Sequence, residues 1–322
     1  MSDENRLLVK VATLYYKNRL TQNEIADRLG ISRQSVGRIL QRAQELGIVQ
    51  IKIHAPTAYA SDLEYLLETE FKLKEAIVVE PLTETDEAIK EAIGKAAADF
   101  IQRRLKSGDI IGLSWSTTVY QCALHMEPVN VRGVTVVGLN GSLNVTTYPT
   151  HAEFVIHRMA EACGGTPVLL AAPMFVDRPD IKQSLLTDSK IAQALALARQ
   201  SNFAVFGIGD LSEQSSPFKA GYVTLEMLEH FKQRGVAGDI CGRFIDINGN
   251  PCLSDIAERT IAVELEDLRK KPLSVGVAGG LRKARAILGA LHGQFCNVLI
   301  TDAFTAQVIL ELQGVQPAAV QN

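Results

Sequence analysis

Residues 20–32 read Leu-Thr-Gln-Asn-Glu-Ile-Ala-Asp-Arg-Leu-Gly-Ile-Ser, and this stretch decides the fold of the N-terminal region. Thr21 is followed three residues later by Glu24, the spacing of a capping box that opens a helix. Gly30 stands where that helix would end, because glycine readily adopts the positive φ that often follows a last helical turn. Ser32 then offers an N-cap to a further helix. Two short helices joined by a tight turn that contains glycine form a helix-turn-helix.

Apolar residues on both sides of this stretch complete a small domain. A helix before it is predicted from the spacing of Leu7, Leu8, Val11, Leu14 and Tyr15. The helix after it would bury Val36, Ile39 and Leu40. Residues 47–53 then alternate apolar and polar side chains, as a strand or wing would. The pattern predicts a winged helix-turn-helix over residues 1–55.

The side chains left outside on the last of these helices suit the major groove of DNA, which admits an α-helix. Arginine pairs with guanine edges and glutamine with adenine edges, so the first residues of the helix would read bases, while Lys52 would meet a phosphate. The predicted DNA-binding residues are Thr21, Gln22, Arg28, Ser32, Arg33, Gln34, Ser35, Arg38 and Arg42. The alternative is a solvated helical hairpin that binds no nucleic acid.

Charge is spread unevenly along the chain. The 322 residues carry a net charge of −3, which alone says nothing of nucleic acid. Residues 1–55 hold nine Lys/Arg and five Asp/Glu, a net +4, so the remainder holds 24 and 31, a net −7. A basic head on an acidic body suggests an anionic partner for the head.

Composition excludes several classes of protein. Hydrophobic residues are 47% and charged residues 21%, which is typical of a globular chain and not of a disordered one. No apolar run reaches 18 residues and the first residues do not read as a secretory signal, so we expect a cytoplasmic protein with no membrane contact. Five scattered cysteines without a CxxC motif, and no HExxH or Walker A motif, give no indication of a metal or cofactor.

Beyond a boundary segment at residues 54–61, short apolar strands alternate with helices. Strands are predicted at 76–79, 110–114, 134–139, 168–171, 204–208, 274–278 and 298–301, and helices at 88–105, 151–162, 191–198, 223–232, 282–291 and 303–312. This alternation predicts a doubly wound, mostly parallel α/β domain over residues 56–322. A helix at 62–73 would either pair with a second copy of itself or pack on this body.

Ligands bind such sheets at the carboxyl ends of strands, and four loops there carry glycine and small polar residues. Gly112–Thr118 would present hydroxyls and helix N-terminal amides to a phosphate; its rival interpretation is a nucleophile elbow at Ser114. Gly138–Asn144 has a similar composition. Gly207–Asp210 begins like a dinucleotide-binding GxGxxG but lacks its last glycine. Gly279–Lys283 would add positive charge for an anion, or would simply be a solvated helix start.

Asp239 follows a glycine in the run Ala-Gly-Asp-Ile-Cys-Gly-Arg-Phe-Ile-Asp, residues 237–246. Its carboxylate could accept hydrogen bonds from sugar hydroxyls, or it could cap a turn. Four stretches of the chain carry a family resemblance: residues 20–32, Gly-Leu-Ser-Trp at 112–115, the run at 237–246, and Val-Ala-Gly-Gly at 277–280 followed by Lys283. In these stretches the chain resembles the SorC-type (SorC/DeoR) sugar-binding transcriptional regulators. The resemblance covers nearly the whole chain.

The resemblance implies a bacterial regulator of a carbohydrate or polyol catabolic operon, not an enzyme. Its body would resemble sugar-phosphate isomerases, and it would act as a homodimer or homotetramer on double-stranded operator DNA. The effector would be a small phosphorylated sugar or polyol, held by Ser114, Ser116, Thr117, Asn140, Gly141, Ser142, Asp239, Gly279, Gly280 and Lys283. Some relatives hold the effector through a Schiff-base lysine near the second loop; residues 138–149 contain no lysine, so non-covalent binding is expected. The alternative function is a sugar-phosphate isomerase or deaminase with a fused helix-turn-helix, because fold alone does not decide function.

Overall fold

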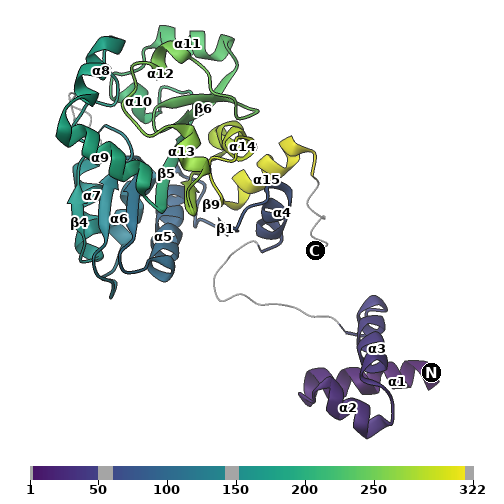
Figure 1. Ribbon diagram of the computed structural model, residues 1–322. Coiled ribbons are helices and arrows are strands. Elements are labelled where there is room, and N and C mark those ends of the chain that lie inside the picture. Colours follow the sequence, from purple (N-terminus) through teal and green to yellow (C-terminus); the bar gives the residue numbers. More distant parts are fainter. Residues whose placement is uncertain (1–2, 50–60, 142–151, 316–322) are drawn as a thin grey trace. The chain divides into compact units, whose positions relative to one another are not determined.

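The computed structural model describes residues 3–49, 61–141 and 152–315 (Figure 1). Backbone contacts divide the chain into two compact units, Met1–Thr57 and Ala58–Asn322. Each unit is described by itself. No described helix is both long and apolar enough to cross a membrane.

The N-terminal unit contains the predicted helix-turn-helix. Its elements are α1 (Asp3–Ala12), the π-helical turn η1 (Thr13–Lys17), α2 (Gln22–Leu29) and α3 (Arg33–Glu45). Both hydrogen bonds of the capping box are present, from Glu24 N to Thr21 Oγ1 (3.3 Å) and from Thr21 N to Glu24 Oε2 (2.7 Å). Gly30 ends α2 with φ 66°, as predicted. The predicted wing at 47–53 extends outside the described residues, which stop at Val49 in this unit.

The N-terminal core is small and contains most of the predicted apolar residues. Val11, Leu14, Ile25, Val36 and Leu40 are buried together. The prediction was wrong for Leu7, which is 39% exposed on α1. Leu7 therefore lies on the solvent-exposed side of α1, outside this core.

The C-terminal unit is built on a parallel sheet, as predicted. Its strands are β1 (Glu75–Val79), β2 (Ile110–Leu113), β3 (Thr135–Gly138), β4 (Thr166–Val168), β5 (Phe203–Gly209), β8 (Leu273–Val277) and β9 (Val298–Asp302). They pair in the order β1-β9-β8-β5-β2-β3-β4, and every pair is parallel. An antiparallel hairpin of β6 (Val236–Ile240) and β7 (Arg243–Asp246) joins the end of β5.

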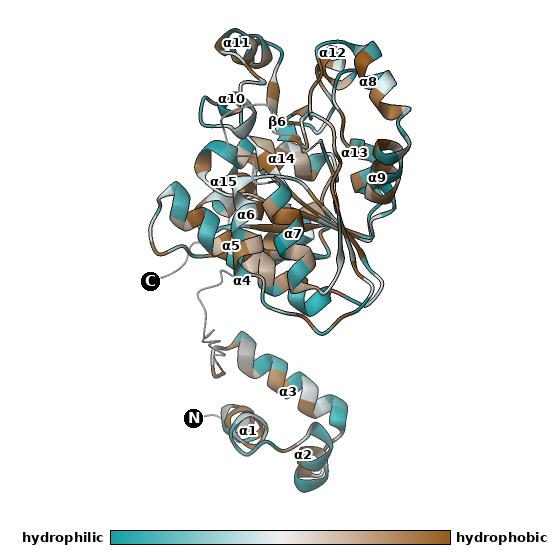
Figure 2. Cartoon of the chain, turned by 90° about the vertical axis from the view of Figure 1, so that its left-hand side faces the viewer, coloured by the Kyte–Doolittle hydropathy of each residue, from teal (hydrophilic) through white to brown (hydrophobic). Residues whose placement is uncertain are grey.

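Helices cover both faces of this sheet, which confirms the doubly wound class. One face carries α5 (Asp86–Arg104), α6 (Thr117–His125) and α7 (Ala152–Ala162). The other carries α4 (Ser61–Phe71), α9 (Ser189–Gln200), α13 (Leu265–Arg269), α14 (Ala284–His292) and α15 (Ala303–Gln313). The short elements are α8 (Pro179–Leu186), α10 (Ser216–Lys219), α11 (Leu225–Gln233), α12 (Ser254–Ala257) and the 3-10 turn η2 (Leu281–Lys283). Figure 2 shows hydrophobic strands enclosed between helices whose outer faces carry hydrophilic residues.

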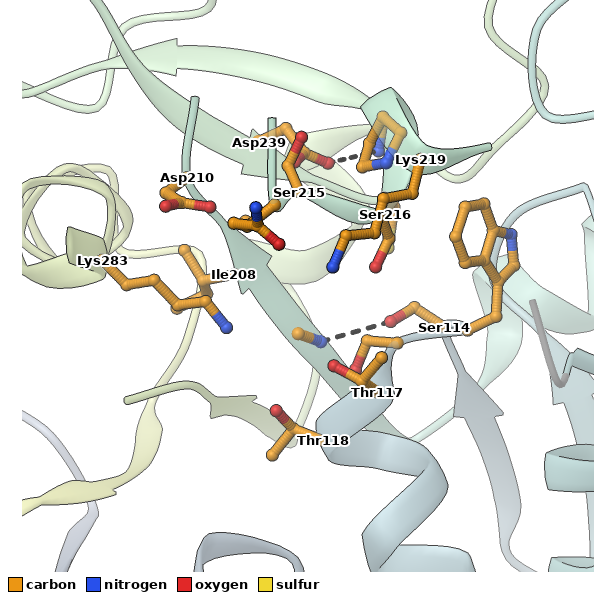
Figure 3. Close-up of a pocket in the computed structure, with 18 of the residues that line it drawn as sticks. Ser114, Thr117, Thr118, Ile208, Asp210, Ser215, Ser216, Lys219, Asp239 and Lys283 are labelled. Carbon is orange, nitrogen blue, oxygen red and sulfur yellow. Dashed lines mark hydrogen bonds between the residues drawn. The ribbon is translucent and has the colours of Figure 1, made fainter. Parts of the chain in front are cut away.

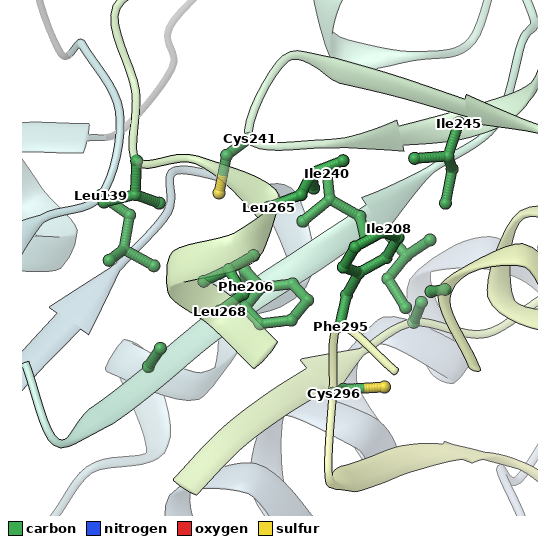
Figure 4. Packing of buried hydrophobic residues seen from close by; sticks show 14 of the residues in the cluster. Leu139, Phe206, Ile208, Ile240, Cys241, Ile245, Leu265, Leu268, Phe295 and Cys296 are labelled. Atoms are coloured by element: carbon green, nitrogen blue, oxygen red, sulfur yellow. The ribbon is translucent and has the colours of Figure 1, made fainter. Parts of the chain in front are cut away.

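Side chains of the central strand β5 alternate between the two faces. Phe203 and Val205 pack against α5 to α7, whereas Phe206 and Ile208 join the opposite cluster (Figure 4). Both sets are buried because helices lie above and below the strand. This explains why β5 reads as an almost continuous apolar run.

The helix predicted at 62–73 packs on the body. In α4, Leu67 is fully buried, and Glu64 and Glu68 accept hydrogen bonds from backbone amides of the edge strand β1, at Val78 N (2.9 Å) and Ala76 N (2.8 Å). The helix therefore covers the open edge of the sheet. Burial raises the pKa of the Glu64 carboxyl, with nearby Glu68 and Glu75 adding to the shift against the Val78 hydrogen bond.

Candidate functional site

The strand order reverses between the neighbours β2 and β5. From β2 the chain continues to β3 and β4 on one side, and from β5 it continues to β8 and β9 on the other. Loops that diverge in this way leave a crevice at the carboxyl ends of the strands. A pocket of about 780 Å³, including the space that opens to solvent, lies here (Figure 3).

The loop after β2 forms the floor of the pocket. Ser116 is the N-cap of α6 and accepts a hydrogen bond from Val119 N (3.0 Å), so Thr117 and Thr118 occupy the first helical turn. Both threonines line the pocket, and the first amides of a helix have no intrahelical acceptor. Ser114 Oγ accepts from Gly207 N (3.2 Å), which ties this loop to β5. A side chain at Gly207 would collide with Ser116, since a Cβ would lie 2.7 Å from its side chain.

The β6–β7 hairpin places a buried carboxyl beside this floor. Its two-residue turn consists of Cys241 (φ 53°) and Gly242 (φ 77°), the positive φ values of a type I′ turn. Asp239 Oδ2 accepts from Gly242 N (3.1 Å) and thereby supports the turn. Burial raises the pKa of Asp239 to about 6, with the negative charge of Asp210 adding to the shift. Asp239 thus caps the turn, which is one of the two roles predicted from the sequence, and it also lines the pocket.

Several cationic side chains lie around the pocket. Lys283 and Lys219 extend toward it from opposite sides (Figure 3). Arg282 lies 3.5 Å from an Asp210 oxygen and 3.6 Å from an Asp86 oxygen. Asp86 is also paired with Lys90, at 2.6 Å. Burial lowers the pKa of Lys283, and the neighbouring carboxylates of Asp210 and Asp86 act in the opposite direction.

An apolar wall closes the third side. Trp115 Nε1 donates to Gly141 O (3.0 Å), which fixes the indole beside Met174. Asn140 Nδ2 donates to Met174 Sδ (3.2 Å), whereas Asn140 Oδ1 is buried and has no hydrogen-bond partner among the described residues. A buried acceptor left without a donor is costly, so this oxygen could accept a hydrogen bond from a ligand.

The pocket brings together six of the residues predicted to hold an effector: Ser114, Ser116, Thr117, Asn140, Asp239 and Lys283. Gly141 does not line the pocket, but its carbonyl oxygen accepts the hydrogen bond of Trp115, which does. Ser142 lies outside the described residues. Gly279 and Gly280 do not line this pocket; they line a neighbouring hollow. There Gly280 N donates to Asp302 Oδ2 and to Thr305 Oγ1 (both 2.8 Å), so the two glycines shape the backbone before Lys283.

Two rival interpretations of these loops receive no support. A nucleophile elbow at Ser114 would need a histidine base, and no described residue lining the pocket is a histidine. The Gly207–Asp210 run ends a strand that pairs with β6, instead of forming the tight turn into a helix that a dinucleotide site requires.

Several lining residues were absent from the predicted effector-binding set, although Asp210 stood in one of the four loops considered: Asp86, Lys90, Asp210, Gln214, Ser215, Ser216 and Lys219. Residues 210–219 directly follow β5, so the carboxyl-end rule could have identified them. Asp86 and Lys90 lie in the first turns of α5, where Asp86 contacts Arg282 of η2 (3.6 Å), and no local sequence pattern indicates that contact.

The predicted DNA-binding residues lie on α2, on α3 and in the turn before each of them. Arg28, Arg33, Gln34, Arg38 and Arg42 are exposed, with Arg42 paired to Glu45 (3.2 Å). Ser32 is exposed but caps α3, accepting from Ser35 N (3.1 Å), and the half-buried Ser35 lies with its Oγ 2.9 Å from Ser32 Oγ. Both hydroxyls therefore serve the start of the helix. Thr21 and Gln22 line a hollow with Arg33 and Arg19, a residue that was not predicted.

Comparison with known proteins assigns both units. Residues 56–311 match the Sugar-bind family, described as "Putative sugar-binding domain", and residues 12–57 match the MarR family. The chain is 39% identical over 308 residues to the deoxyribonucleoside regulator of Bacillus subtilis, covering 96% of this chain and 98% of that protein. It is 32% identical over 314 residues to the sorbitol operon regulator of Klebsiella pneumoniae, covering 96% and 99%.

The fold agrees with a solved member of this group. The crystal structure of the full-length sorbitol operon regulator SorC from Klebsiella pneumoniae matches with a TM-score of 0.73 at 32% identity, over 96% of this chain and all of that one. The helix-turn-helix, the parallel α/β body and the similarity over nearly the full length lead to one assignment. The chain belongs to the SorC-type family of sugar-binding transcriptional regulators.

Proposed function

We propose that this chain binds operator DNA through α3 and that a phosphorylated sugar or polyol in the pocket between β2 and β5 sets its affinity for that DNA. The observation that carries the proposal is the convergence, in one pocket, of the α6 N-terminus, the Lys283 amine and the buried Asp239 carboxyl. These groups complement a ligand with a phosphate at one end and hydroxyls at the other.

The phosphate would lie at the first turn of α6. Free amides and the helix dipole favour an anion there, and the half-buried Lys283 amine would add a positive charge beside them. Hydroxyls of the ligand would donate to Asp239 and to the Asn140 oxygen, which has no partner among the residues that the structure describes. No lysine occurs in 138–149, so the binding is proposed to be reversible.

DNA reading would follow from the exposed face of α3. Arg33, Gln34 and Arg38 would contact base edges, and Arg28 and Arg42 would contact phosphates. A homodimer or homotetramer would place two such helices on repeated half-sites, and the effector would favour one spacing of them over another. The names of the relatives, a deoxyribonucleoside regulator and a sorbitol operon regulator, support a carbohydrate or polyol operon as the target. The protein would act on this DNA in the cytoplasm.

A thermal-shift screen of phosphorylated sugars and polyols tests the pocket. A ligand that binds the folded chain raises its melting temperature by mass action. The shift should shrink strongly in Ser114→Ala and Lys283→Ala and persist in Lys95→Ala, which removes an exposed lysine from the middle of α5. Equal shifts in all four proteins would show that the ligand binds elsewhere.

A sugar-phosphate isomerase remains the second candidate because Asp239, with a pKa of about 6, could act as a general base near neutral pH. Incubating the full chain with each stabilising sugar phosphate and following it by NMR tests this. Conversion that disappears in Asp239→Asn would favour the enzyme, and an unchanged ligand would favour the regulator.

A further inference from the structure

One face of α15 exposes an apolar stripe. Phe304 is 48% exposed and Leu312 is 46% exposed, with the half-buried Val308 between them. Residues four apart share a face of a helix, so the three side chains form one row. Leu281, 59% exposed, extends the row, because it lines the same hollow as Phe304. We name Leu281, Phe304, Val308 and Leu312 the α15 face.

This face is built differently from the rest of its helix. Ala306, Ile309 and Leu310 are fully buried and hold α15 against the sheet. In the row, Val308 packs partly against the same core, whereas Phe304 and Leu312 are exposed. A contiguous row of large apolar side chains left in water is typical of a surface that binds another protein.

We propose that the α15 face binds the α15 face of a second copy of this chain, with the two helices antiparallel about a two-fold axis. A two-fold interface must be self-complementary. Arg282 lies at the Phe304 end of the row, and the exposed Glu311 lies at the Leu312 end. Antiparallel pairing brings each arginine toward the other copy's glutamate and aligns the two apolar rows. The proposal rests on the proposed function in requiring an oligomer, and it locates the surface that forms one.

The same surface is connected to the pocket by three consecutive residues. In η2, Leu281 belongs to the α15 face, and Arg282 and Lys283 both line the hollow beside Phe304 and the pocket between β2 and β5. A ligand that draws the Lys283 amine inward must act on the turn that carries Leu281. Occupancy of the pocket would therefore change the fit of the two copies.

A photo-reactive phenylalanine analogue placed at position 304 of the full chain tests the contact. Irradiation should give a covalent dimer whose cross-linked peptides come from α15 or η2 of the second copy. The same analogue at position 225 is the matched control, since Leu225 is similarly exposed (56%) on α11. A cross-link from position 225 but not from position 304, or a cross-link at 304 to another protein, would overturn the proposal.

Sedimentation velocity separates this proposal from the proposed function. Phe304→Glu combined with Leu312→Glu should lower the mass of the assembly by half, whereas Leu225→Glu should leave it unchanged. Circular dichroism of each variant confirms that it is folded, and Phe304→Ala, which removes the ring without adding charge, gives a second measure. An assembly that resists both changes would refute the α15 contact alone, whereas a wild-type chain that is monomeric with and without operator DNA would refute the oligomeric regulator itself.

Discussion

Single residues decide the electrostatics of the pocket, and Asp239 is the clearest case. In the folded chain its carboxyl ionises near pH 6, whereas the ordinary value is 3.8, because burial opposes the charge. The free energy of unfolding therefore falls as pH rises through this window, by roughly 3 kcal/mol in total for a shift of this size. Without a ligand that donates hydrogen bonds to the Asp239 carboxylate, the folded chain is less stable by this amount above pH 6.

Replacing Asp239 by Asn should remove that pH dependence. Asp239→Asn cannot ionise and can still accept from Gly242 N, so it should be more stable than wild type by roughly 2–3 kcal/mol at pH 8. The difference should shrink as the pH falls toward 4, where the wild-type carboxyl is protonated. Urea unfolding followed by the fluorescence of Trp115, the single tryptophan, measures the C-terminal unit directly. A difference of the same size at pH 5 and pH 8 would mean that the carboxyl is ionised at both.

Two helical glycines have opposite tolerance for a side chain. A Cβ at Gly37 in α3 would find nothing closer than a Gln22 side-chain oxygen at 3.9 Å, whereas a Cβ at Gly94 in α5 would lie 2.5 Å from the Gln121 side chain and 2.8 Å from the backbone of α6. Gly37→Ala should therefore stabilise α3 by about 0.5–1 kcal/mol through helix propensity. Gly94→Ala should destabilise the body by about 1–3 kcal/mol because α5 and α6 must separate. Hydrogen exchange of each helix checks both signs, and the same sign for both would contradict these packing distances.

At the scale of elements, the helix-turn-helix depends on its capping box. Thr21→Ala removes the acceptor for Glu24 N and should lower the local stability of α2 by about 1 kcal/mol, while Thr21→Ser keeps the hydroxyl and should retain it. Hydrogen exchange of the α2 amides in the full chain measures this. Equal protection in the Ala and Ser variants would show that the cap contributes little.

The proposed contact of α3 with DNA predicts two kinds of arginine on and near this helix. Arg42→Ala should weaken binding to all DNA sequences alike and reduce the salt slope of the affinity by about one, as expected for one phosphate contact. Arg33→Ala should cost about 1–3 kcal/mol on the operator and relax preference at one base pair. Fluorescence anisotropy at several salt concentrations distinguishes them, with Arg132→Ala on the body as the control. If Arg33→Ala and Arg42→Ala gave the same change, the assignment of α3 to the major groove would be wrong.

Elements with a strong local signal were predictable from the sequence. The capping box, the positive φ at Gly30 and the buried strands of the sheet all depend on residues close together in the chain. Other elements depend on distant partners. The β6–β7 hairpin, with Cys241 in its turn, pairs with the end of β5, and strand 168–171 was predicted two residues too late because β4 begins at Thr166, opposite Thr135 of β3.

At the scale of the molecule, the candidate site collects residues from across the C-terminal unit. The glycine and hydroxyl loops indicated Ser114, Asn140, Asp239 and Lys283 because each follows a strand. The sequence could not indicate that Asp86, which is paired with Lys90, also contacts Arg282, since that contact joins the start of α5 to η2. The sequence also could not show that Gly279 and Gly280 shape the backbone before Lys283 without lining the pocket themselves.

The uneven distribution of charge along the chain corresponds to two separate groups of basic residues. The +4 head carries the exposed arginines of α3, while the −7 body still gathers Lys90, Lys219, Arg282 and Lys283 around one pocket. The proposed regulation requires a coupling between the DNA-binding surface on one unit and the pocket on the other. By linkage, any change that the effector makes in DNA affinity must be matched by an equal change that DNA makes in effector affinity.

The most direct measurement of the central claim is a titration of operator DNA, selected by the full chain from random sequence, with and without the phosphorylated sugar that gives the largest thermal shift. We predict that the ligand changes the Kd for DNA between about 5-fold and 150-fold in wild type and in Lys95→Met, the usual range for allosteric coupling. Lys283→Met should keep the ligand-free Kd and lose the response. A wild-type Kd that the ligand does not change, or a Lys283→Met variant that responds like wild type, would contradict the account.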